Sequence, residues 1–363
     1  MTLVTSTASV TQNLKAMGDK KYLIIYHEED NDGVCSGALA KSYLVTSLNV
    51  AEEQIFLFPA TYAKMDKLEK NGFKVRIDGV FNTASNVSDN DEEQVVWIVD
   101  ALSWFDNIIL TDISFNNFGA IEKLYKKLGS NFIWVDHHAP VIQESIKRGF
   151  DEKIVGIRDT SRSAILNMYK YLYDPFDVEY LEGKVPLSLR YLSAWDSWSY
   201  EREGLDFEKC RTFNIGMTKI GKLDINWWYK NLTNIYAGLC GDEAFKVGQM
   251  WVDDFNEHWK RVMAKNAQGG FTIGGRSAIL VFSDSATSSL CFDSVKDQYQ
   301  NGICVKTSSD GNIIISLYNT DNQKDFHCGE YLKEHYNGGG HAGAAGGKMT
   351  FEEFAEHYKT KTF

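Results

Sequence analysis

The chain has 363 residues, of which 44% are hydrophobic and 24% are charged, a composition typical of a globular protein with two or three domains. The formal net charge of −11 argues against a broad electrostatic grip on long duplex nucleic acid, because such binding depends on many Lys and Arg contacts to phosphate. No apolar run approaches the ~20 residues that span a bilayer, and the six cysteines are widely spaced. We therefore expect a cytoplasmic protein with free thiols and no membrane partner.

The first half of the chain alternates short apolar runs with helical patterns. The predicted strands are residues 22–26, 95–99, 108–110 and 132–135. The predicted helices are residues 34–45 and 118–128, the second ending at Gly129. Continuous apolar strands that alternate with helices predict a parallel sheet covered by helices on both faces.

The second half changes character. Residues 205–265 are rich in Trp, Asn, Lys and Asp without repeated strand signals, which indicates a helical connector. Predicted strands follow at residues 277–282, 303–306 and 313–317, then a helix at residues 326–336 and a last one from about Thr350. Asp310-Gly311 predicts a hairpin between two of the strands. The expected division is a flexible tail (1–19), a catalytic domain (20–204), the connector (205–267) and a substrate-binding domain (268–363).

The most informative stretch is Asp136-His137-His138, which directly follows the predicted strand at residues 132–135. A carboxylate and two imidazoles that leave a buried strand must be paired, hydrated or bound to a metal. Asp112 also follows a predicted strand, and Asp196 lies between two tryptophans. Because ligands bind beyond the carboxyl ends of the strands of a parallel sheet, we interpret these residues as the rim of a catalytic site. Surface decoration and helix capping are the alternatives.

The loop after the first strand, residues 27–33, is strongly acidic. Alternate residues of an extended segment point to one side, so Glu28, Asp30 and Asp32 are predicted to converge on one cavity. Gly33 is expected to let the backbone turn into the next helix. A calcium loop of the EF-hand type is excluded, because loop position 12 is a lysine where that loop needs Glu. A solvated acidic turn remains the alternative.

Residues 337–347 contain six glycines and three alanines around His341. Such a backbone can approach a ligand closely and offer free N–H groups to an anion. A P-loop is excluded, because the Gly-Lys pair at the end of the segment is followed by Met349 and not by Ser or Thr. We predict that substrate is bound by Gly338, Gly339, Gly340 and His341. A flexible linker is the alternative.

Taken in this order, the motifs resemble those of the DHH phosphoesterase family with its C-terminal DHH-associated domain (DHHA1). The corresponding segments are residues 30–33, Asp112, residues 136–138, Asp196 and the Gly-Gly-Gly-His segment at 338–341. The resemblance covers nearly the whole chain and is greatest to the oligoribonuclease (nanoRNase B-like) branch. It implies an α/β fold with an N-terminal parallel-sheet DHH domain, helices on both faces, a helical connector and a smaller C-terminal α/β domain of the DHHA1 type.

The resemblance also implies two Mn²⁺ ions, with Mg²⁺ as the alternative, and oxygen-rich ligation with some imidazole suits these metals. The implied metal ligands are Glu28, Asp30, Asp32, Asp112 as a bridge, His137 and Asp196. His27 is the rival of Glu28, because many members carry a His two or four residues before the first Asp. As catalytic residues, His138 would contact the scissile phosphate or assist the leaving oxygen, and Asp136 would orient an imidazole. Tyr318 stands where the family often has a substrate-binding Arg.

The implied function is a phosphodiesterase that hydrolyses short RNA oligonucleotides (nanoRNA) to mononucleotides, with 3′-phosphoadenosine 5′-phosphate (pAp) as a second substrate. The alternatives are a cyclic or linear dinucleotide phosphodiesterase and a RecJ-like single-strand exonuclease. A non-enzymatic alternative is a nucleotide-binding regulator. Short oligonucleotides or dinucleotides are the expected partners, a homodimer is compatible with each alternative, and Trp195 and Trp198 are candidates for base stacking.

Overall fold

The computed structural model describes residues 20–65, 73–75, 81–83, 102, 104–115, 117–173, 184–283, 288–320, 326–340 and 342–363. The chain divides into two compact units, Met1–Gln249 and Met250–Phe363. The division falls within the long helix α12 (Gly241–Asn266). The expected domain boundaries at 204/205 and 267/268 stay predictions. In the described part of the chain, no helix is long and apolar enough to cross a membrane.

The first unit is built on a four-stranded parallel sheet with the strand order β2-β1-β5-β6. The strands are β1 (Tyr22–His27), β2 (Ile55–Ala60), β5 (Asn107–Thr111) and β6 (Phe132–Val135). Successive side chains of a strand point to opposite faces. Ile24 lies in one hydrophobic core, whereas Leu23 and Ile25 lie in the other. The prediction of a parallel sheet buried on both faces is therefore confirmed.

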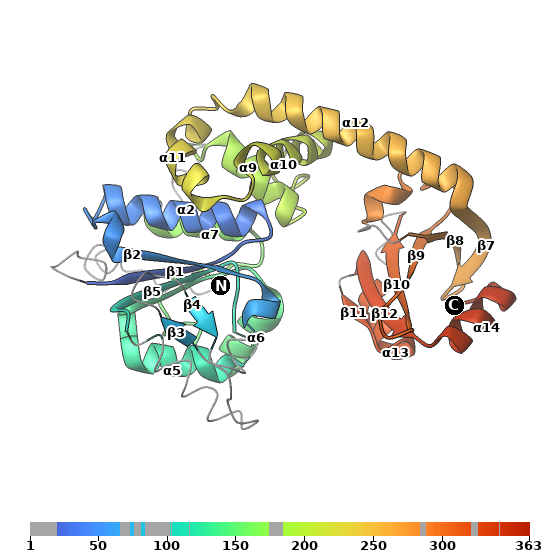
Figure 1. Cartoon of the computed structure of the whole chain (residues 1–363), viewed down its shortest axis with the longest axis horizontal. Coiled ribbons are helices and arrows are strands. Elements are labelled where there is room, and N and C mark those ends of the chain that lie inside the picture. Colours follow the sequence, from blue (N-terminus) through green and yellow to red (C-terminus); the bar gives the residue numbers. More distant parts are fainter. Residues whose placement is uncertain are drawn as a thin grey trace. The chain divides into compact units, whose positions relative to one another are not determined.

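Helices cover the two faces of this sheet (Figure 1). The helices on one face are α2 (Asn31–Thr46), α7 (Ala164–Tyr173), α9 (Leu187–Asp196), α10 (Phe207–Gly221) and α11 (Ile225–Tyr236). Those on the other face are α5 (Phe118–Leu128) and α6 (Ala139–Lys147). The predicted helices correspond to α2 and α5, and Gly129 ends α5 with a positive φ of 57°.

The sequence patterns did not predict β2. Its apolar run is short and ends in Pro59, which lowers the expectation of a strand. The structure places β2 at the edge of the sheet, where a proline is tolerated. A further short pair consists of β3 (Phe73–Val75) and β4 (Phe81–Thr83). The predicted strand at residues 95–99 lies outside the described residues.

The second unit contains a six-stranded mixed sheet with the order β11-β12-β10-β9-β8-β7. Its strands are β7 (Ala267–Ile273), β8 (Arg276–Phe282), β9 (Asn301–Thr307), β10 (Ile313–Asn319), β11 (Gly339–Gly340) and β12 (Ala344–Met349). One face packs against α13 (Cys328–His335) and α14 (Phe351–Thr360), and the other against Trp259 and Met263 of α12. The three predicted strands are confirmed, as is the hairpin between β9 and β10, where Gly311 has a positive φ of 81°.

Candidate metal centre

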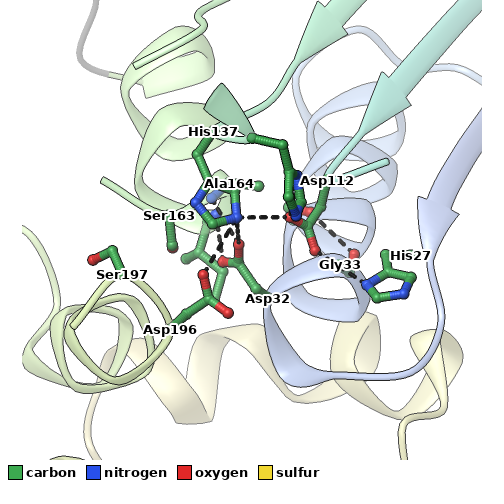
Figure 2. Close-up of polar contacts among 12 residues, drawn as sticks. His27, Asp32, Gly33, Asp112, His137, Ser163, Ala164, Asp196 and Ser197 are labelled. Carbon is green, nitrogen blue, oxygen red and sulfur yellow. Dashed lines mark hydrogen bonds and ion pairs between the residues drawn. The ribbon is translucent and has the colours of Figure 1, made fainter. Parts of the chain in front are cut away.

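The predicted site residues of the first unit gather at one edge of the parallel sheet (Figure 2). β1 ends at His27, β5 is followed by Asp112, and β6 is followed by residues 136–138. The in-register parallel pairing of β1, β5 and β6 brings these three strand ends together. Helix α2 begins directly after β1, so its first turn lies at the same edge, as expected for a ligand site in such a sheet.

Asp112 lies at the centre of the cluster. Its side chain is almost fully buried, with an exposed fraction of 1%. One carboxylate oxygen lies 3.2 Å from Nε2 of His137, and the other lies 3.7 Å from Nδ1 of His27. The backbone of Asp112 has a positive φ of 58°, a conformation that Asp tolerates better than most residues but that still stores strain. This turn aims the carboxylate between the two imidazoles.

Asp32 lies in the first turn of α2 and is held by a second helix. Its carboxylate accepts hydrogen bonds from the backbone N–H groups of Ala164, at 2.7 Å, and Ile165, at 2.9 Å. These groups are the first turn of α7, where unpaired N–H groups and the helix dipole favour a negative charge. Nε2 of His137 lies 3.7 Å from the same carboxylate. The carboxylate is therefore fixed from one side and faces His137.

Asp30 joins the end of β1 to the start of α2. One oxygen accepts the backbone N–H of Gly33 at 2.9 Å, which caps the helix. The other accepts Nδ1 of His27 at 3.0 Å. Gly33 was expected to supply an unusual turn, but it has no positive φ. It is needed for a different reason, because a Cβ at this position would overlap the carbonyl group of His27.

The geometry favours His27 over Glu28 as a metal ligand. The carboxylate of Glu28 forms an ion pair with Lys64, and Glu28 belongs to no ligand group among the described residues. His27 was the rival candidate and lies with Asp30 and Asp112. Strand β1 extends one residue further than predicted and ends at His27. The imidazole of His27 therefore points toward the cluster, and the carboxylate of Glu28 points toward Lys64.

Asp136 has the position of an orienting residue. Its side chain is fully buried and accepts hydrogen bonds from two backbone N–H groups, those of His137 at 2.7 Å and His138 at 3.1 Å. Nδ1 of His138 donates to it at 2.7 Å, and Nε1 of Trp134 donates at 3.1 Å. Because Nδ1 of His138 is taken, Nε2 is the ring nitrogen that Asp136 does not engage.

Three groups of ligand atoms could each hold a cation, and within each group the atoms lie within 4.8 Å of one another. The groups are His27 with Asp30 and Asp112, Asp32 with His137 and Asp196, and Asp112 with His137 and His138. The first two correspond to the two ligand sets expected from the sequence, with His27 in the place of Glu28. The third connects them through Asp112 and His137.

Unsatisfied polar atoms also indicate a cation. Among the described residues, the buried polar atoms without a hydrogen-bond partner include Nε2 of His27, Oδ1 of Asp112 and Oδ2 of Asp196. Buried polar atoms normally have partners. The two carboxylate oxygens lie 3.2 and 3.4 Å from Nε2 of His137 and so face the cluster, whereas Nε2 of His27 lies 3.4 Å from a carboxylate oxygen of Glu29. Carboxylate oxygens with a minority of imidazole nitrogens form a donor set that fits Mn²⁺ or Mg²⁺.

The electrostatics of the metal-free cluster agree with this assignment. Burial, together with the neighbouring Asp32, raises the pKa of Asp112 well above its usual range. Burial likewise raises the pKa of Asp32 and of Asp196. Burial alone would lower the pKa of His137, but the nearby Asp32 and Asp196 outweigh it and raise that pKa. A bound cation would favour the charged carboxylates and so remove the cost of crowding them.

Three residues that the sequence patterns did not single out support the site. Asn31 donates hydrogen bonds to Asn214 and Thr218 and so ties the start of α2 to α10. Asn167 donates to the backbone oxygen of Asp136 at 3.1 Å. The ring of Tyr62, 40% exposed, lies near the imidazoles of His27 and His138. No local pattern marks these residues, because their partners are distant in the sequence.

The glycine-rich segment of the second unit is more ordered than a free loop. Gly339 and Gly340 form β11, paired with β12, and the N–H of Gly338 donates to the backbone oxygen of Leu332 at 2.9 Å. The sheet and α13 therefore use part of the N–H groups that the sequence suggested for an anion. His341 lies outside the described residues, and a substrate-binding role of the segment stays a prediction.

Comparisons with known proteins agree with the fold. Residues 21–192 match the DHH family, N-terminal domain, and this region includes every site residue from His27 to His138, whereas Asp196 lies just beyond it. No curated protein has a significant sequence match.

Similar solved structures cover nearly all of the chain. An exopolyphosphatase-related protein from Bacteroides fragilis is 15% identical, with a TM-score of 0.50 over 99% of this chain and 97% of that chain. The DHH domain of a protein described as a member of a family of ribosomal proteins is 13% identical, with a TM-score of 0.53 over 98% and 88%. A pGpG-specific phosphodiesterase, PggH, from Vibrio cholerae is 15% identical, with a TM-score of 0.48 over 94% and 97%. At these identities the first two likenesses support the fold alone, an α/β chain with a parallel sheet followed by a mixed sheet.

Proposed function

We propose that this protein, whose residues 21–192 form a DHH-family N-terminal domain, is a metal-dependent phosphodiesterase that hydrolyses short RNA oligonucleotides to mononucleotides. The observation that carries the proposal is the set of ligand groups joined through Asp112 and His137. A cluster of buried carboxylates at the carboxyl edge of a parallel sheet is costly to fold and suits a binuclear metal site.

The residues would divide their work as follows. One cation would be held by His27, Asp30 and Asp112, and the other by Asp112, Asp32, His137 and Asp196. Two bound divalent cations would supply the positive charge that acidifies a water and stabilises charge developing on phosphorus. The imidazole of His138, whose Nδ1 is held by Asp136, would donate a proton from Nε2 to the leaving oxygen of the substrate. The carboxylate of Asp136 keeps that imidazole in one tautomer.

Two features support a short substrate and Mn²⁺ as the metal. The net charge of −11 argues against a broad electrostatic grip on a long strand. The mixed ligation by carboxylate and imidazole suits Mn²⁺, with Mg²⁺ as the alternative. We propose that residues 268–363 hold the substrate through the glycine-rich segment and that residues 205–267 connect this domain to the catalytic one. We also propose that pAp is a second substrate. Membership of the nanoRNase B-like branch, a homodimer and a cytoplasmic location stay predictions.

The test is a substrate panel assayed with Mn²⁺ and, separately, with Mg²⁺. It contains pAp, di- to pentaribonucleotides, cyclic dinucleotides and long single-stranded DNA. The expected result is fastest turnover of the di- to pentanucleotides with Mn²⁺, and two bound metal ions per chain by elemental analysis. Asp112→Asn should lose metal and activity together, whereas Asp254→Asn, at an exposed position of α12, should lose neither.

Other outcomes would contradict the proposal in distinct ways. Faster hydrolysis of cyclic dinucleotides than of any linear oligomer, or turnover confined to linear dinucleotides, would indicate a dinucleotide phosphodiesterase. Processive digestion of long DNA would indicate a RecJ-like exonuclease. Tight nucleotide binding with fewer than two metal ions and no turnover would indicate a regulator.

A further inference from the structure

A group of aromatic side chains lies at the end of α9, next in the sequence to a residue of the candidate metal centre. Trp195 and Trp198 stand on either side of Asp196 in the sequence, and Oδ2 of Asp196 is 3.4 Å from Nε2 of His137. The two indole rings are stacked, with centroids 5.9 Å apart and an interplanar angle of 27°. The aromatic group is therefore attached directly to a residue of the candidate metal centre.

A third ring extends the stack. Phe207, at the start of α10, lies 5.8 Å from Trp195 and 6.0 Å from Trp198, with interplanar angles of 36° and 30°. The three rings thus have similar orientations, and Tyr200 packs against Phe207 at 5.1 Å. Trp198 is nevertheless 58% exposed. An indole that is supported by other rings and open to solvent can accept another flat ring.

The backbone holds Trp198 in this position at a cost. The N–H of Ser199 donates to the backbone oxygen of Ala194 at 3.0 Å, which is the main bond of a Schellman motif. Trp198 occupies the left-handed position of this motif, with a φ of 51°, where glycine is the usual residue. A bulky residue with positive φ is a genuine outlier, and such strain collects at functional sites.

We propose that Trp198, backed by Trp195 and Phe207, is a stacking platform for a nucleobase of the substrate. The inference rests on the proposed function and deepens it, because it assigns the substrate to base-bearing phosphodiesters and not to inorganic polyphosphate. Every base has a flat π-face, so stacking on an indole selects for nucleotides without selecting a sequence. Trp198 lies two residues along the chain from Asp196, a candidate metal ligand.

The first test separates base binding from catalysis. Adenosine 5′-monophosphate is titrated against the protein while tryptophan fluorescence is recorded, with ribose 5-phosphate as the probe that lacks a base. Quenching by the nucleotide alone, abolished by Trp198→Ala and retained by Trp198→Phe, is the expected result. Leu187→Ala, which truncates an exposed side chain at the other end of α9, should leave the quenching unchanged. Quenching that survives Trp198→Ala would overturn the proposal.

The second test uses turnover of a diadenylate and of the same dinucleotide with one abasic residue. Trp198→Ala should raise KM for the diadenylate by about 10-fold, equivalent to 1.4 kcal/mol, and leave kcat and the abasic substrate unaffected. An unchanged KM in a protein that hydrolyses dinucleotides would overturn the platform and leave the proposed function standing. Base-dependent quenching without hydrolysis of any diester would overturn the proposed function and leave the platform standing. An unchanged KM with an altered oligomeric state would mean that the rings are a subunit contact, which also overturns the proposal.

The strain gives a further check. Trp198→Gly and Trp198→Ala remove the same indole, but only glycine adopts the left-handed conformation without penalty. The glycine variant should therefore melt about 2 to 4 °C above the alanine variant, while both show the same raised KM. Equal melting temperatures would mean that the residue is not strained and would remove the backbone argument.

Discussion

Replacing Asp136 by asparagine tests how the centre is organised. Asp136 is fully buried, and one of its oxygens accepts both backbone N–H groups of the following two residues as well as Nδ1 of His138. The other oxygen accepts Nε1 of Trp134 at 3.1 Å. In Asp136→Asn, the amide oxygen can keep the three hydrogen bonds from His137 and His138. The amide NH₂ group then faces the indole N–H of Trp134, and because both groups are donors, neither has an acceptor.

The magnitude follows from these four bonds. One unsatisfied buried donor costs ~1–3 kcal/mol, and the loss of charge weakens each remaining bond from the ~1.5–3 kcal/mol of a charged partner to that of a neutral one, ~0.5–1.5 kcal/mol. Relief of the buried charge offsets part of this. We expect a destabilisation of roughly 2–4 kcal/mol and a larger one for Asp136→Ala, which leaves all four donors without this acceptor.

Activity should fall for a separate reason. Burial lowers the pKa of His138, but the hydrogen bond to Asp136 outweighs it and raises that pKa. Without the carboxylate the pKa drops and the tautomer is no longer fixed, so a loss of about 100-fold in kcat is expected, within the range for general acid–base catalysis. Asp136 belongs to none of the ligand groups among the described residues, so metal content should stay at the wild-type value.

Urea denaturation, elemental analysis and steady-state kinetics measure these three quantities on one sample. An Asp136→Asn variant that keeps kcat within about twofold and unfolds at the wild-type urea concentration would show that Asp136 does not organise the centre. Loss of metal to the same extent as in Asp112→Asn would also contradict this role, because Asp136 would then act as a ligand.

Three further predictions follow from the geometry. By elemental analysis, His27→Ala should lose about one of two metal ions, and it should lose most activity, whereas Glu28→Ala should keep both ions. The opposite pattern of metal content would restore Glu28 as the ligand. Gly33→Ala should lower the melting temperature and the metal affinity together, because its Cβ would overlap the backbone of His27; unchanged values would contradict that packing. The metal-free protein should be less stable at pH 8 than at pH 5.5. Burial and Asp32 raise the pKa of Asp112, and hydrogen bonds to Asp112 and Asp30 outweigh burial to raise the pKa of His27 to about 11. Folded-state pKa values above the unfolded ones give stability that is lost as the pH rises through them. Asp112→Asn should flatten this profile in thermal melts, and a metal-free protein that gains stability toward pH 8 would show that the sign is wrong.

The sequence was sufficient to predict three of the four strands of the parallel sheet and most of the residues that gather at its edge. Apolar runs such as residues 132–135 become strands buried on both faces, and parallel strands place their carboxyl ends at one edge. Polar residues at the ends of such runs must then lie near one another, as Asp112 and His137 do. Local patterns are enough for this step, because the architecture itself brings the strand ends together.

The remaining features depend on contacts that no local pattern encodes. Asp32 is held by the first turn of α7, which lies far along the chain at Ala164, and Asn31 is held by α10. The choice between His27 and Glu28 depended on where β1 ends, which is uncertain by one or two residues in any sequence-based assignment. A shift of one residue in a strand moves a side chain to the opposite face, and here it exchanges the candidate ligand.

Charge crowding at this site favours the metal-bound state, whereas the backbone strain is present with or without a cation. Asp112 and Trp198 both have positive φ, and three carboxylates of the cluster have raised pKa values without a cation. Each of these features raises the free energy of the metal-free fold. Because a cation binds the folded arrangement and not the unfolded chain, each occupied site adds about 2.7 kcal/mol of stability at a free metal concentration of 100 times Kd. Metal binding would therefore offset the cost of assembling the site. Loss of metal should loosen the start of α2 and the end of α9 first, where the candidate ligands Asp32 and Asp196 lie.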